Sequence, residues 1–520
     1  MTNTKIVAKW LAAAVPMGLG LGLTAPTLAH AAPVGTAADR TVVATTNGKV
    51  RGTAEGKVRT FQGIPYAAPP VGGLRWKSPQ PAARWTGVRD ATTPGRACAQ
   101  PEGLPIGIPN DNEDCLYLNV TTPTAKQAGK QAGKRPVVVW IHGGSLMYGA
   151  GHQYGGASLA EQGAVVVSMN YRLGVMGFLT DPSQPGADGL GLEDQQAALR
   201  WVKANAAAFG GDPDNVTIAG QSGGGYSVCG HLASPASAGL FHRAVVQSAP
   251  CATGGSRTRA EAEADARRVI ATLGCETNTA DCLRDKSVSE LLAAYDPYSE
   301  PRPVTGTKLM PLSPAEALRT GRFNRVPVLI GVNHDEERGR VLGQELASGT
   351  PMKPEEYEPA IRHQFGSKSD AVLALYPLTK YGSAGEALAA ALTDSAWSTP
   401  TLETAQLLSR WTPTRTYEFS ERDTPWFEGF PTPSFEQHAA HMTELPYLFD
   451  HPPLFEGVPA DQARFRTRML RTWTHFAATG KTDWPDFRTG HDYVQTLSST
   501  TWKRADFAAD HNTAFWKNSR

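Results

Sequence analysis

A strand-like apolar run that leads directly into a glycine-rich turn constrains the fold of this chain more than any other feature. Residues 217–219 are Thr-Ile-Ala, and residues 220–225 read Gly-Gln-Ser-Gly-Gly-Gly before a plausible helix. Glycines have no Cβ, so they permit a strained turn and a close approach of strand and helix. A serine hydroxyl reacts as a nucleophile only where a base can reach it. The stretch therefore predicts a strand–turn–helix elbow with Ser222 at its tip.

Other continuous apolar runs predict a parallel sheet that is covered on both faces. They lie at residues 137–141, 165–169, 216–219, 245–246 and 328–330. Unbroken Val/Ile runs, rather than alternating ones, are typical of such strands. Residues 193–209 have a helical pattern that opens with acidic residues and ends at Gly210-Gly211. This alternation predicts an α/β fold, with the mostly helical segments 261–322 and 355–410 packed over the sheet.

Length and charge narrow the class of protein. The 520 residues carry a formal net charge of +1 and are 41% hydrophobic, which is enough for one enlarged α/β domain or two domains. The near-neutral charge gives no reason to expect nucleic acid as a partner. No repeat of about 20–50 residues is visible, which argues against a solenoid or a propeller.

The N-terminus predicts export. Lys5 and Lys9 form a basic start, residues 10–23 are apolar, and Ala29-His30-Ala31 supplies the small-x-small pattern of a cleavage site. The apolar stretch is shorter than the ~20 residues that a membrane span needs, so no stable membrane anchor is expected. We expect residues 1–31 to be a secretory signal peptide that is cleaved near Ala31, and the mature protein to be secreted.

Six cysteines fit an oxidising compartment. Cys98 and Cys115 bracket a loop rich in Pro, Gly and Asn, and Cys275 and Cys282 bracket a very short loop, so each pair is expected to form a local disulfide. For Cys229 and Cys251 two alternatives stay open: a third bridge, or a buried thiol at Cys229 on the helix after Ser222. None of the six has the spacing of a zinc site.

A serine nucleophile needs a base, and the base needs a carboxylate that orients it. After the run at 328–330 comes N-H-D-E-E at 333–337, whose three adjacent carboxylates leave the choice of acid open. Two histidines, His438 and His441, precede an apolar segment and are candidates for the base. An H-x-x-H pair is also compatible with a metal clip, but no partner ligands accompany it, and no metal is expected.

Small residues upstream predict an anion-binding turn. The sequence W-I-H-G-G-S at 140–145 follows a strand-like run. Consecutive small residues let backbone N–H groups point into a site, as the stabilisation of an oxyanion requires. The alternative is an ordinary glycine turn.

These motifs resemble those of the type-B carboxylesterases, the group within the α/β-hydrolase fold that includes cholinesterases, bacterial para-nitrobenzyl esterases and fungal lipases. The matching stretches are G-I-P-Y-A at 63–67 with L-R-W at 74–76, E-D-C-L-Y-L-N-V at 113–120, H-G-G at 142–144, N-Y-R-L-G at 170–174, F-G-G-D-P at 209–213, the serine elbow, Q-S at 247–248 and E-L-P-Y at 444–447. They span about residues 42–515. The resemblance, strongest to the bacterial para-nitrobenzyl esterases, implies one α/β-hydrolase domain over residues 32–520, with a mostly parallel sheet flanked by helices and helical insertions over the active site.

The resemblance assigns roles to individual residues. The family's acid falls in a D-E-G turn, which matches Asp335-Glu336 and implies Glu336 as the acid. Its histidine lies three residues before E-L-P, which implies His441 rather than His438 as the base. The further positions that it implies are the oxyanion N–H groups of Gly144, Ser145 and Gly223, Ser248 near the catalytic histidine, and the Cys98–Cys115 bridge.

Three positions depart from the family's pattern. Gln221 replaces the usual Glu before the nucleophile, which removes a negative charge and lessens any preference for cationic substrates. Glu337 replaces the Gly after the acid, which puts the geometry of that loop in doubt. Ser145 replaces the common third Gly, and because the backbone N–H acts there, we expect the hole to survive.

The sequence therefore predicts a secreted serine esterase that uses Ser222, His441 and Glu336, forms an acyl-enzyme, and needs no cofactor. We expect a small-molecule ester as substrate, with short- or medium-chain esters favoured, and a monomer. The loop at 99–114 is too short for a broad lid, which counts against a lipase of long-chain acylglycerols. The alternative from another class is a cholinesterase-like binding protein without catalysis.

Overall fold

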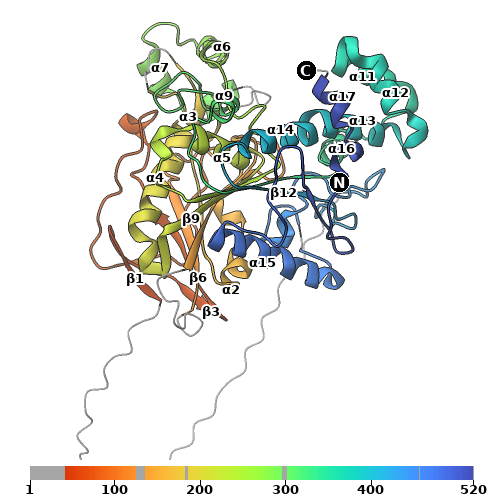
Figure 1. The fold of residues 1–520 in the computed structure, drawn as a ribbon. Coiled ribbons are helices and arrows are strands. Elements are labelled where there is room, and N and C mark those ends of the chain that lie inside the picture. Colours follow the sequence, from red (N-terminus) through yellow and green to blue (C-terminus); the bar gives the residue numbers. More distant parts are fainter. Residues whose placement is uncertain (1–40, 125–134, 182–185, 296–300, 456, 519–520) are drawn as a thin grey trace, which may run out of the picture. The chain divides into compact units, whose positions relative to one another are not determined.

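Ten strands form one mixed sheet in the computed structural model, which describes residues 41–124, 135–181, 186–295, 301–455 and 457–518 (Figure 1). The strands are β3 (Thr53–Glu55), β4 (Val58–Pro65), β6 (Tyr117–Pro123), β7 (Arg135–Ile141), β8 (Val165–Met169), β9 (Gly211–Gln221), β10 (Arg243–Gln247), β11 (Val328–Asn333), β12 (Thr414–Phe419) and β13 (Gln495–Leu497). Their order is β13-β12-β11-β10-β9-β7-β8-β6-β4-β3. A separate sheet joins β1 (Val42–Thr45), β2 (Gly48–Arg51) and β5 (Val88–Asp90).

The centre of the large sheet is parallel. Strands β8, β7, β9, β10, β11, β12 and β13 pair in parallel in that order, whereas β6, β4 and β3 pair antiparallel at one edge. The five apolar runs that the sequence indicated all lie in β7 to β11. The predicted parallel α/β sheet is confirmed.

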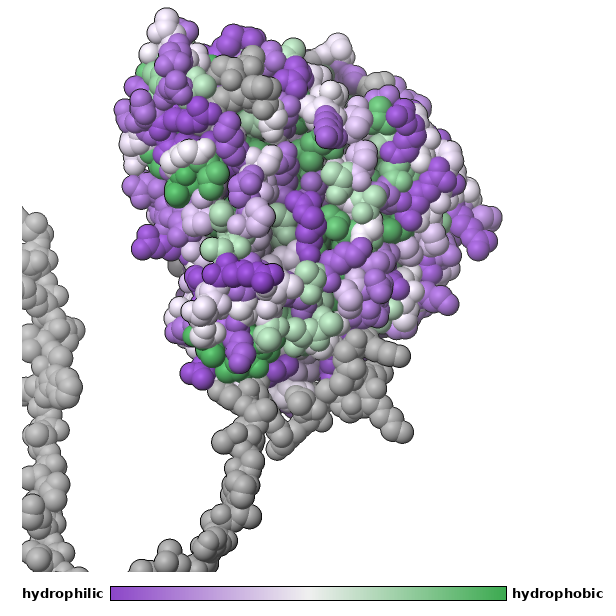
Figure 2. Space-filling model, turned by 90° about the vertical axis from the view of Figure 1, so that its left-hand side faces the viewer, coloured by the Kyte–Doolittle hydropathy of each residue, from purple (hydrophilic) through white to green (hydrophobic). Residues whose placement is uncertain are grey.

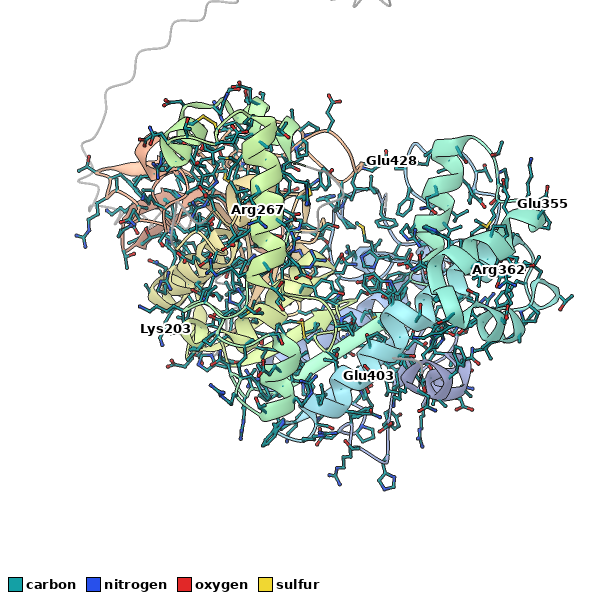
Figure 3. All side chains as sticks on the ribbon, turned by 90° about the horizontal axis from the view of Figure 1, so that it is seen from above. Lys203, Arg267, Glu355, Arg362, Glu403 and Glu428 are labelled. Carbon is teal, nitrogen blue, oxygen red and sulfur yellow. A yellow bond between two sulfur atoms is a disulfide. The ribbon has the colours of Figure 1, made fainter. Side chains whose placement is uncertain are left out.

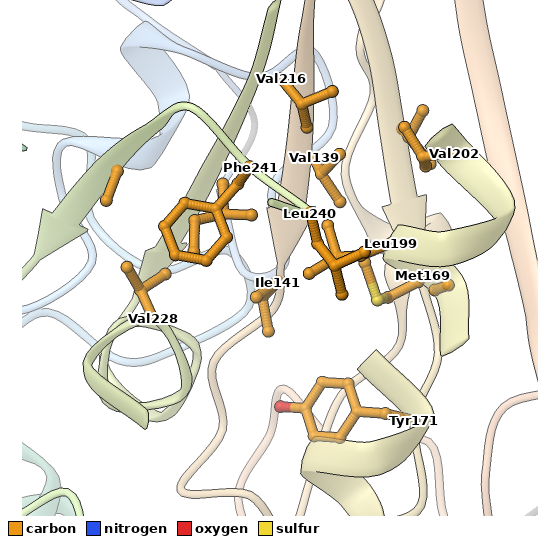
Figure 4. Close-up of a cluster of buried hydrophobic side chains, with 14 of the residues drawn as sticks. Val139, Ile141, Met169, Tyr171, Leu199, Val202, Val216, Val228, Leu240 and Phe241 are labelled. Atoms are coloured by element: carbon orange, nitrogen blue, oxygen red, sulfur yellow. The ribbon is translucent and has the colours of Figure 1, made fainter. Parts of the chain in front are cut away.

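Helices cover both faces of this sheet (Figure 1). One face packs against α4 (Leu190–Asn205), α5 (Gly223–Ala233) and α14 (Thr399–Leu408), and the other against α2 (Ala157–Glu161) and α15 (Ala463–Thr479). Side chains alternate along a strand. Val139 of β7 therefore belongs to the first core, the cluster that also contains Leu199 and Val228 (Figure 4), whereas Trp140 lies in the second core with Trp473.

The remaining helices form two groups outside the sheet. The first follows β10 and comprises α6 (Arg259–Thr272), α7 (Thr279–Asp285), α8 (Val288–Ala294) and α9 (Pro314–Thr320). The second follows β11 and comprises α10 (Arg338–Ser348), α11 (Pro354–Phe365), α12 (Ser369–Leu375), α13 (Ala384–Thr393) and a π-helical turn (Asp394–Ser398). Short helices α3 (Gly174–Phe178), α16 (Phe507–Asp510) and α17 (Thr513–Asn518) complete the fold. Both predicted helical segments are thus largely helical.

Helix α4 begins three residues before the predicted start. It runs from Leu190, because Leu190 and Leu192 are buried and extend its apolar face towards the N-terminus. The α-helix ends at Asn205, and residues 206–209 continue as a 3₁₀ turn up to Gly210, which has φ 85°. A left-handed glycine of this kind commonly ends a helix.

The surface is largely polar where helices face outward. Lys203 of α4, Arg267 of α6 and Arg362 of α11 are exposed, and Figure 3 labels all three on the outer helices. On the face drawn in Figure 2, apolar side chains occur in small groups among hydrophilic ones. Among the described residues, none of the helices combines the length and the apolar character that crossing a bilayer requires. The predicted signal peptide, residues 1–31, lies outside the described residues.

Candidate active site

The register of the parallel strands brings the candidate residues to one edge of the sheet. Gly220 of β9 pairs with Ile141 of β7 and with Val246 of β10, and Gln247 pairs with Gly331 of β11. The loops that follow these strands begin at the same level because the strands are parallel. They carry the H-G-G-S turn, Ser222, Ser248 and Glu336.

Ser222 lies on a strained turn between β9 and α5. Its φ of 54° and ψ of −123° are unusual for a residue with a side chain, and its N–H donates to Gln247 O at 3.0 Å. A Cβ on Gly224 would lie 2.0 Å from Ile141 O, and one on Gly220 would lie 2.4 Å from the carbonyl of Gly224. Both positions therefore require glycine, and the strain places Ser222 at the tip of the elbow.

His441 and Glu336 form a hydrogen-bonded pair beside this elbow. His441 Nδ1 lies 2.5 Å from Glu336 Oε2, and the main-chain N–H of His441 donates to Glu336 O at 3.1 Å. The other carboxylate oxygen, Glu336 Oε1, accepts from the N–H of Asn333 at 2.9 Å. The Glu336 side chain is fully buried, whereas that of His441 is 23% exposed. The carboxylate is thus fixed, and the imidazole can reach a ligand.

The second ring nitrogen of His441 faces the residue before Ser222. Gln221 Nε2 lies 3.1 Å from His441 Nε2. With Nδ1–H donating to Glu336, Nε2 carries the lone pair, and the Gln221 amide donates to it. Within the described part of the chain, the Ser222 hydroxyl makes no hydrogen bond to His441 or to another residue. His441 therefore lies next to the elbow, and its Nε2 lone pair accepts a hydrogen bond from the neighbouring Gln221 amide.

The H-G-G-S turn approaches the elbow with unused backbone donors. Gly144, Ser145 and Leu146 have φ values of 95°, 56° and 61°. A Cβ built on Gly223 would lie 3.1 Å from Ser145 N and 2.9 Å from Leu146 N. Across the described residues, no acceptor receives a hydrogen bond from the N–H groups of Gly144, Ser145 or Gly223. The three N–H groups proposed for the oxyanion hole are thus adjacent and available.

Buried side chains hold this turn in place. Gln100 accepts from the N–H of Gly149 at 2.8 Å and donates to Gly149 O at 3.1 Å, and Tyr171 OH donates to His142 O at 2.7 Å. The rings of His142 and Tyr171 stack with their centroids 4.4 Å apart. Burial lowers the pKa of His142 to about 4, so its ring is neutral at physiological pH. Gln100 belongs to the loop that the Cys98–Cys115 disulfide closes, so that loop supports the turn.

Glu337, the residue in place of the family's glycine, stabilises the acid loop. Its φ of −87° and ψ of −5° lie in the right-handed helical region, where a side chain costs nothing. Its carboxylate accepts a hydrogen bond from Trp397 Nε1 at 2.6 Å, and the Trp397 ring packs on the His441 ring with centroids 4.9 Å apart. The loop thus needs no glycine, and Glu337 holds the Trp397 ring against His441.

A second buried carboxylate, Glu444, lies under the pair and was not predicted. Asn333 Nδ2 donates to Glu444 Oε2 at 2.8 Å, and Gln247 Nε2 donates to Glu444 Oε1 at 3.1 Å. Burial and then the charge of Glu336 raise the pKa of Glu444. Its place three residues after His441, within the E-L-P-Y motif, was the signal in the sequence. Trp397 had no such signal, because 44 residues separate it from His441.

Opposing effects determine the charge state of His441. Burial lowers its pKa, but the charge and hydrogen bond of Glu336, followed by the charges of Glu444 and Glu337, outweigh burial. The pKa of His441 therefore lies above the ordinary value of 6.5. This environment stabilises an imidazolium, which is the state that forms when the ring accepts a proton from a nucleophile.

Among the described residues, two other candidates make no hydrogen bond to the pair. His438 contacts Arg422 through both ring nitrogens, with Nδ1 at 3.0 Å from Arg422 O and Nε2 at 3.0 Å from the guanidinium. It therefore does not converge with His441 on a metal clip. Ser248 is buried at the end of β10, where its N–H donates to Gly331 O at 2.9 Å. Its hydroxyl has no hydrogen bond to His441 among the described residues.

All six cysteines are paired. The disulfides join Cys98 to Cys115, Cys275 to Cys282, and Cys229 to Cys251. The third bridge decides between the two alternatives that the sequence left open for Cys229. It ties α5, the helix that begins after Ser222, to the loop that follows β10 and carries Ser248.

Comparison with known proteins places this geometry in context. The profile of the carboxylesterase family matches residues 39–516. A para-nitrobenzyl esterase of Bacillus subtilis (strain 168) is 34% identical over 86% of this chain and 92% of that protein. A cocaine esterase of Homo sapiens is 32% identical over 89% of this chain and 87% of its own length. A solved para-nitrobenzyl esterase structure superposes with a TM-score of 0.76 and 31% identity, over 91% of this chain and 99% of that one. These matches confirm the predicted α/β-hydrolase fold.

Proposed function

The chain belongs to the carboxylesterase family, and from this premise we propose that it hydrolyses carboxylic esters through an acyl-enzyme on Ser222. The observation that carries the proposal is the 2.5 Å contact between His441 Nδ1 and Glu336 Oε2 beside the strained Ser222 elbow. A histidine that is hydrogen-bonded to a buried carboxylate beside a serine elbow has the arrangement of a Ser-His-acid catalytic triad.

In the proposed reaction, His441 Nε2 takes the proton of Ser222 as Oγ attacks the ester carbonyl carbon. The carbonyl π electrons move to oxygen, and the N–H groups of Gly144, Ser145 and Gly223 stabilise the resulting oxyanion. Each such donor contributes about 3–4 kcal/mol to the transition state. Glu336 stabilises the imidazolium and keeps its orientation. His441 then returns the proton to the leaving alkoxide, and an alcohol departs.

Hydrolysis of the acyl-enzyme repeats these steps with water. His441 accepts a proton from the water as its oxygen attacks the acyl carbon, and then protonates Ser222 Oγ as the acid leaves. Because Gln221 donates to His441 Nε2, this hydrogen bond must break before Nε2 can accept the serine proton. We propose that substrate entry displaces the Gln221 side chain.

Covalent labelling tests the proposal directly. A fluorophosphonate probe is expected to label the native protein, to label Ser348→Ala equally, and to leave Ser222→Ala unlabelled; Ser348 is an exposed control serine at the end of α10. No labelling of the native protein, or equal labelling of Ser222→Ala, would contradict the catalytic role of Ser222 and favour a binding protein without catalysis.

We propose short- and medium-chain esters as the preferred substrates. The loop at 99–114 is tied by the Cys98–Cys115 disulfide and by the buried Gln100, so it cannot open as a broad lid does. Its Ile106 is buried close to Gly144, where it restricts space beside the oxyanion donors. Rates on dissolved para-nitrophenyl butyrate should exceed rates on emulsified triglyceride, and a sharp increase above the solubility limit would indicate a lipase instead.

We also propose that the protein is exported and loses residues 1–31. The basic start, the apolar stretch and the Ala-His-Ala pattern support this. N-terminal sequencing of protein recovered from the medium of a secreting host should begin at Ala32. Retention of Met1 on a protein found only inside the cell would contradict export.

A further inference from the structure

A second cluster of titratable side chains lies outside the catalytic edge. His334 follows β11, Glu418 lies on β12, Asp394 opens the π-helical turn, and His511 follows α16. Figure 1 shows α13 and α16 on the right of the view, with β12 nearer its centre. The reaction proposed above uses none of these four side chains. Four ionisable side chains from four distant segments thus lie together, three of them buried and His334 partly exposed.

The distances within this cluster place two imidazoles on one carboxylate oxygen. Glu418 Oε1 lies 2.9 Å from His334 Nδ1 and 2.5 Å from His511 Nε2. One ligand atom from each of these three residues lies within 4.8 Å of the others. The opposite nitrogen, His511 Nδ1, lies 2.6 Å from Asp394 Oδ1. Tyr376 OH donates to the other oxygen of Asp394 at 2.6 Å, which fixes that carboxylate.

A cavity of about 200 Å³ adjoins the cluster and gives it an approach route. His334, Asp394, Asp510 and His511 contribute to its wall. The side chains of Glu418 and His511 are 3% and 2% exposed, whereas that of His334 is 33% exposed. Two ligands are therefore rigid, and the third can adjust from the cavity side.

We propose that this cluster is a divalent cation site suited to zinc, with His334 Nδ1, His511 Nε2 and Glu418 Oε1 as ligands. Nitrogen and carboxylate donors at about 2.0–2.2 Å are the ones that zinc prefers, and a water from the cavity completes four-coordination. Tetrahedral ligand atoms around such an ion lie about 3.3 Å apart. The two observed contacts to Glu418 must therefore lengthen by less than about 1 Å. The two histidine nitrogens, which lie within 4.8 Å of each other, must come to the same spacing, and a shift of the His334 ring can make both adjustments.

The hydrogen bond between Asp394 and the second ring nitrogen of His511 is a further reason to expect a metal here. A ligating histidine usually donates its other N–H to a carboxylate, which fixes the tautomer and the ring orientation. Asp394 stands in this position towards His511, and it begins a π-helical turn, a geometry frequent at functional sites. The bound ion would join the loop that carries Glu336 to β12 and to the C-terminal segment.

Metal titration of the whole mature protein tests the site. Chelator-treated protein titrated with Zn²⁺ against a chromophoric indicator should bind one equivalent per chain, and Co²⁺ should give the visible absorption of a tetrahedral site. His334→Ala should weaken binding at least about tenfold. His363→Ala, which removes an exposed histidine on α11, should leave binding unchanged.

Glu418→Gln provides a second variant that preserves shape, and it should also lose the tetrahedral Co²⁺ spectrum. Well below one equivalent of zinc on the native protein, or unchanged affinity in His334→Ala, would overturn the proposal. The cluster would then be a purely structural network of buried ion pairs. Fluorophosphonate labelling of Ser222 is independent of both results, so the two proposals fail separately.

Discussion

At the scale of single residues, three carboxylates surround the catalytic base candidate. Glu336 contacts the ring of His441, and Glu444 and Glu337 add their charges from nearby. Since the pKa of His441 is raised above 6.5, the neutral imidazole that a general base requires forms only at higher pH. The raised pKa also favours folding below the unfolded pKa, and this contribution is lost as pH rises through the folded value.

Replacing Glu444 should move the pH dependence of the enzyme. Glu444→Gln removes a charge that raises the pKa of His441, so the acidic limb of kcat/KM should shift to lower pH. Glu436→Gln is the control, because Glu436 is an exposed carboxylate eight residues earlier. A limb that stays in place in Glu444→Gln would show that Glu444 does not act on the base.

Restoring the family's glutamate at position 221 should change both the base and substrate choice. In Gln221→Glu, a carboxylate would lie beside His441 Nε2 where the amide now donates, and its charge should raise the pKa of His441. The acidic limb should move to higher pH, and the rate on butyrylthiocholine relative to a neutral thioester should increase. An unchanged ratio in Gln221→Glu, with Gln221→Ala as the comparison, would contradict an electrostatic role.

At the scale of elements, the elbow depends on the close contact of α5 with the end of β7. Gly224→Ala would bring a Cβ to 2.0 Å from Ile141 O, directly before the H-G-G-S turn. A displacement of about 1 Å at such a site costs about 100-fold in rate, so kcat should fall by at least this factor. Gly230→Ala lies on the same helix with its nearest contact at 3.4 Å, and it should retain activity and stability. Equal activity of the two variants would refute the steric argument.

The disulfide between α5 and the loop after β10 is expected to act mainly on the stability of the fold. Cys229 and Cys251 have a sequence separation of 22, and closing a loop of that length in the unfolded chain corresponds to about 3 kcal/mol. The shorter loop between Cys275 and Cys282, with a separation of 7, corresponds to about 2 kcal/mol. Urea unfolding of the two double-alanine variants should rank them in this order. The reverse order would show that native-state strain outweighs loop entropy.

At the scale of the whole molecule, the candidate active site is assembled from segments that are far apart in the chain. The H-G-G-S turn, the elbow, the acid loop and the His441 loop come from residues between 142 and 444, and three disulfides brace the fold. A site assembled from distant segments exists only when the sheet is complete. Because the disulfides stabilise the folded chain, conditions that allow them to form should also favour activity.

The compartment in which the protein is expressed should therefore determine whether its disulfides form and how stable the protein is. Exported protein should show no free thiol on titration under denaturing conditions, whereas protein kept in a reducing cytoplasm should show up to six thiols and unfold at a lower temperature. Equal thermal stability of the two preparations would show that the bridges are dispensable.

Several features were determined by local sequence. The elbow at 220–224 was predictable because a strand, two glycines and a helix start are all encoded within a few residues. The five parallel strands were predictable because burial on both faces leaves continuous apolar runs. The pairs Cys98–Cys115 and Cys275–Cys282 were predictable because each closes a short loop.

Only the tertiary structure decided which distant groups meet. It brought Trp397 onto the ring of His441, placed Glu444 under the acid, and joined Cys229 to Cys251. It also turned the Gln221 amide towards His441 and gathered the cluster around Glu418. The physical reason is that periodicity and turn chemistry act over a few residues, whereas these contacts depend on strand order and on the packing of helices that the chain forms far apart.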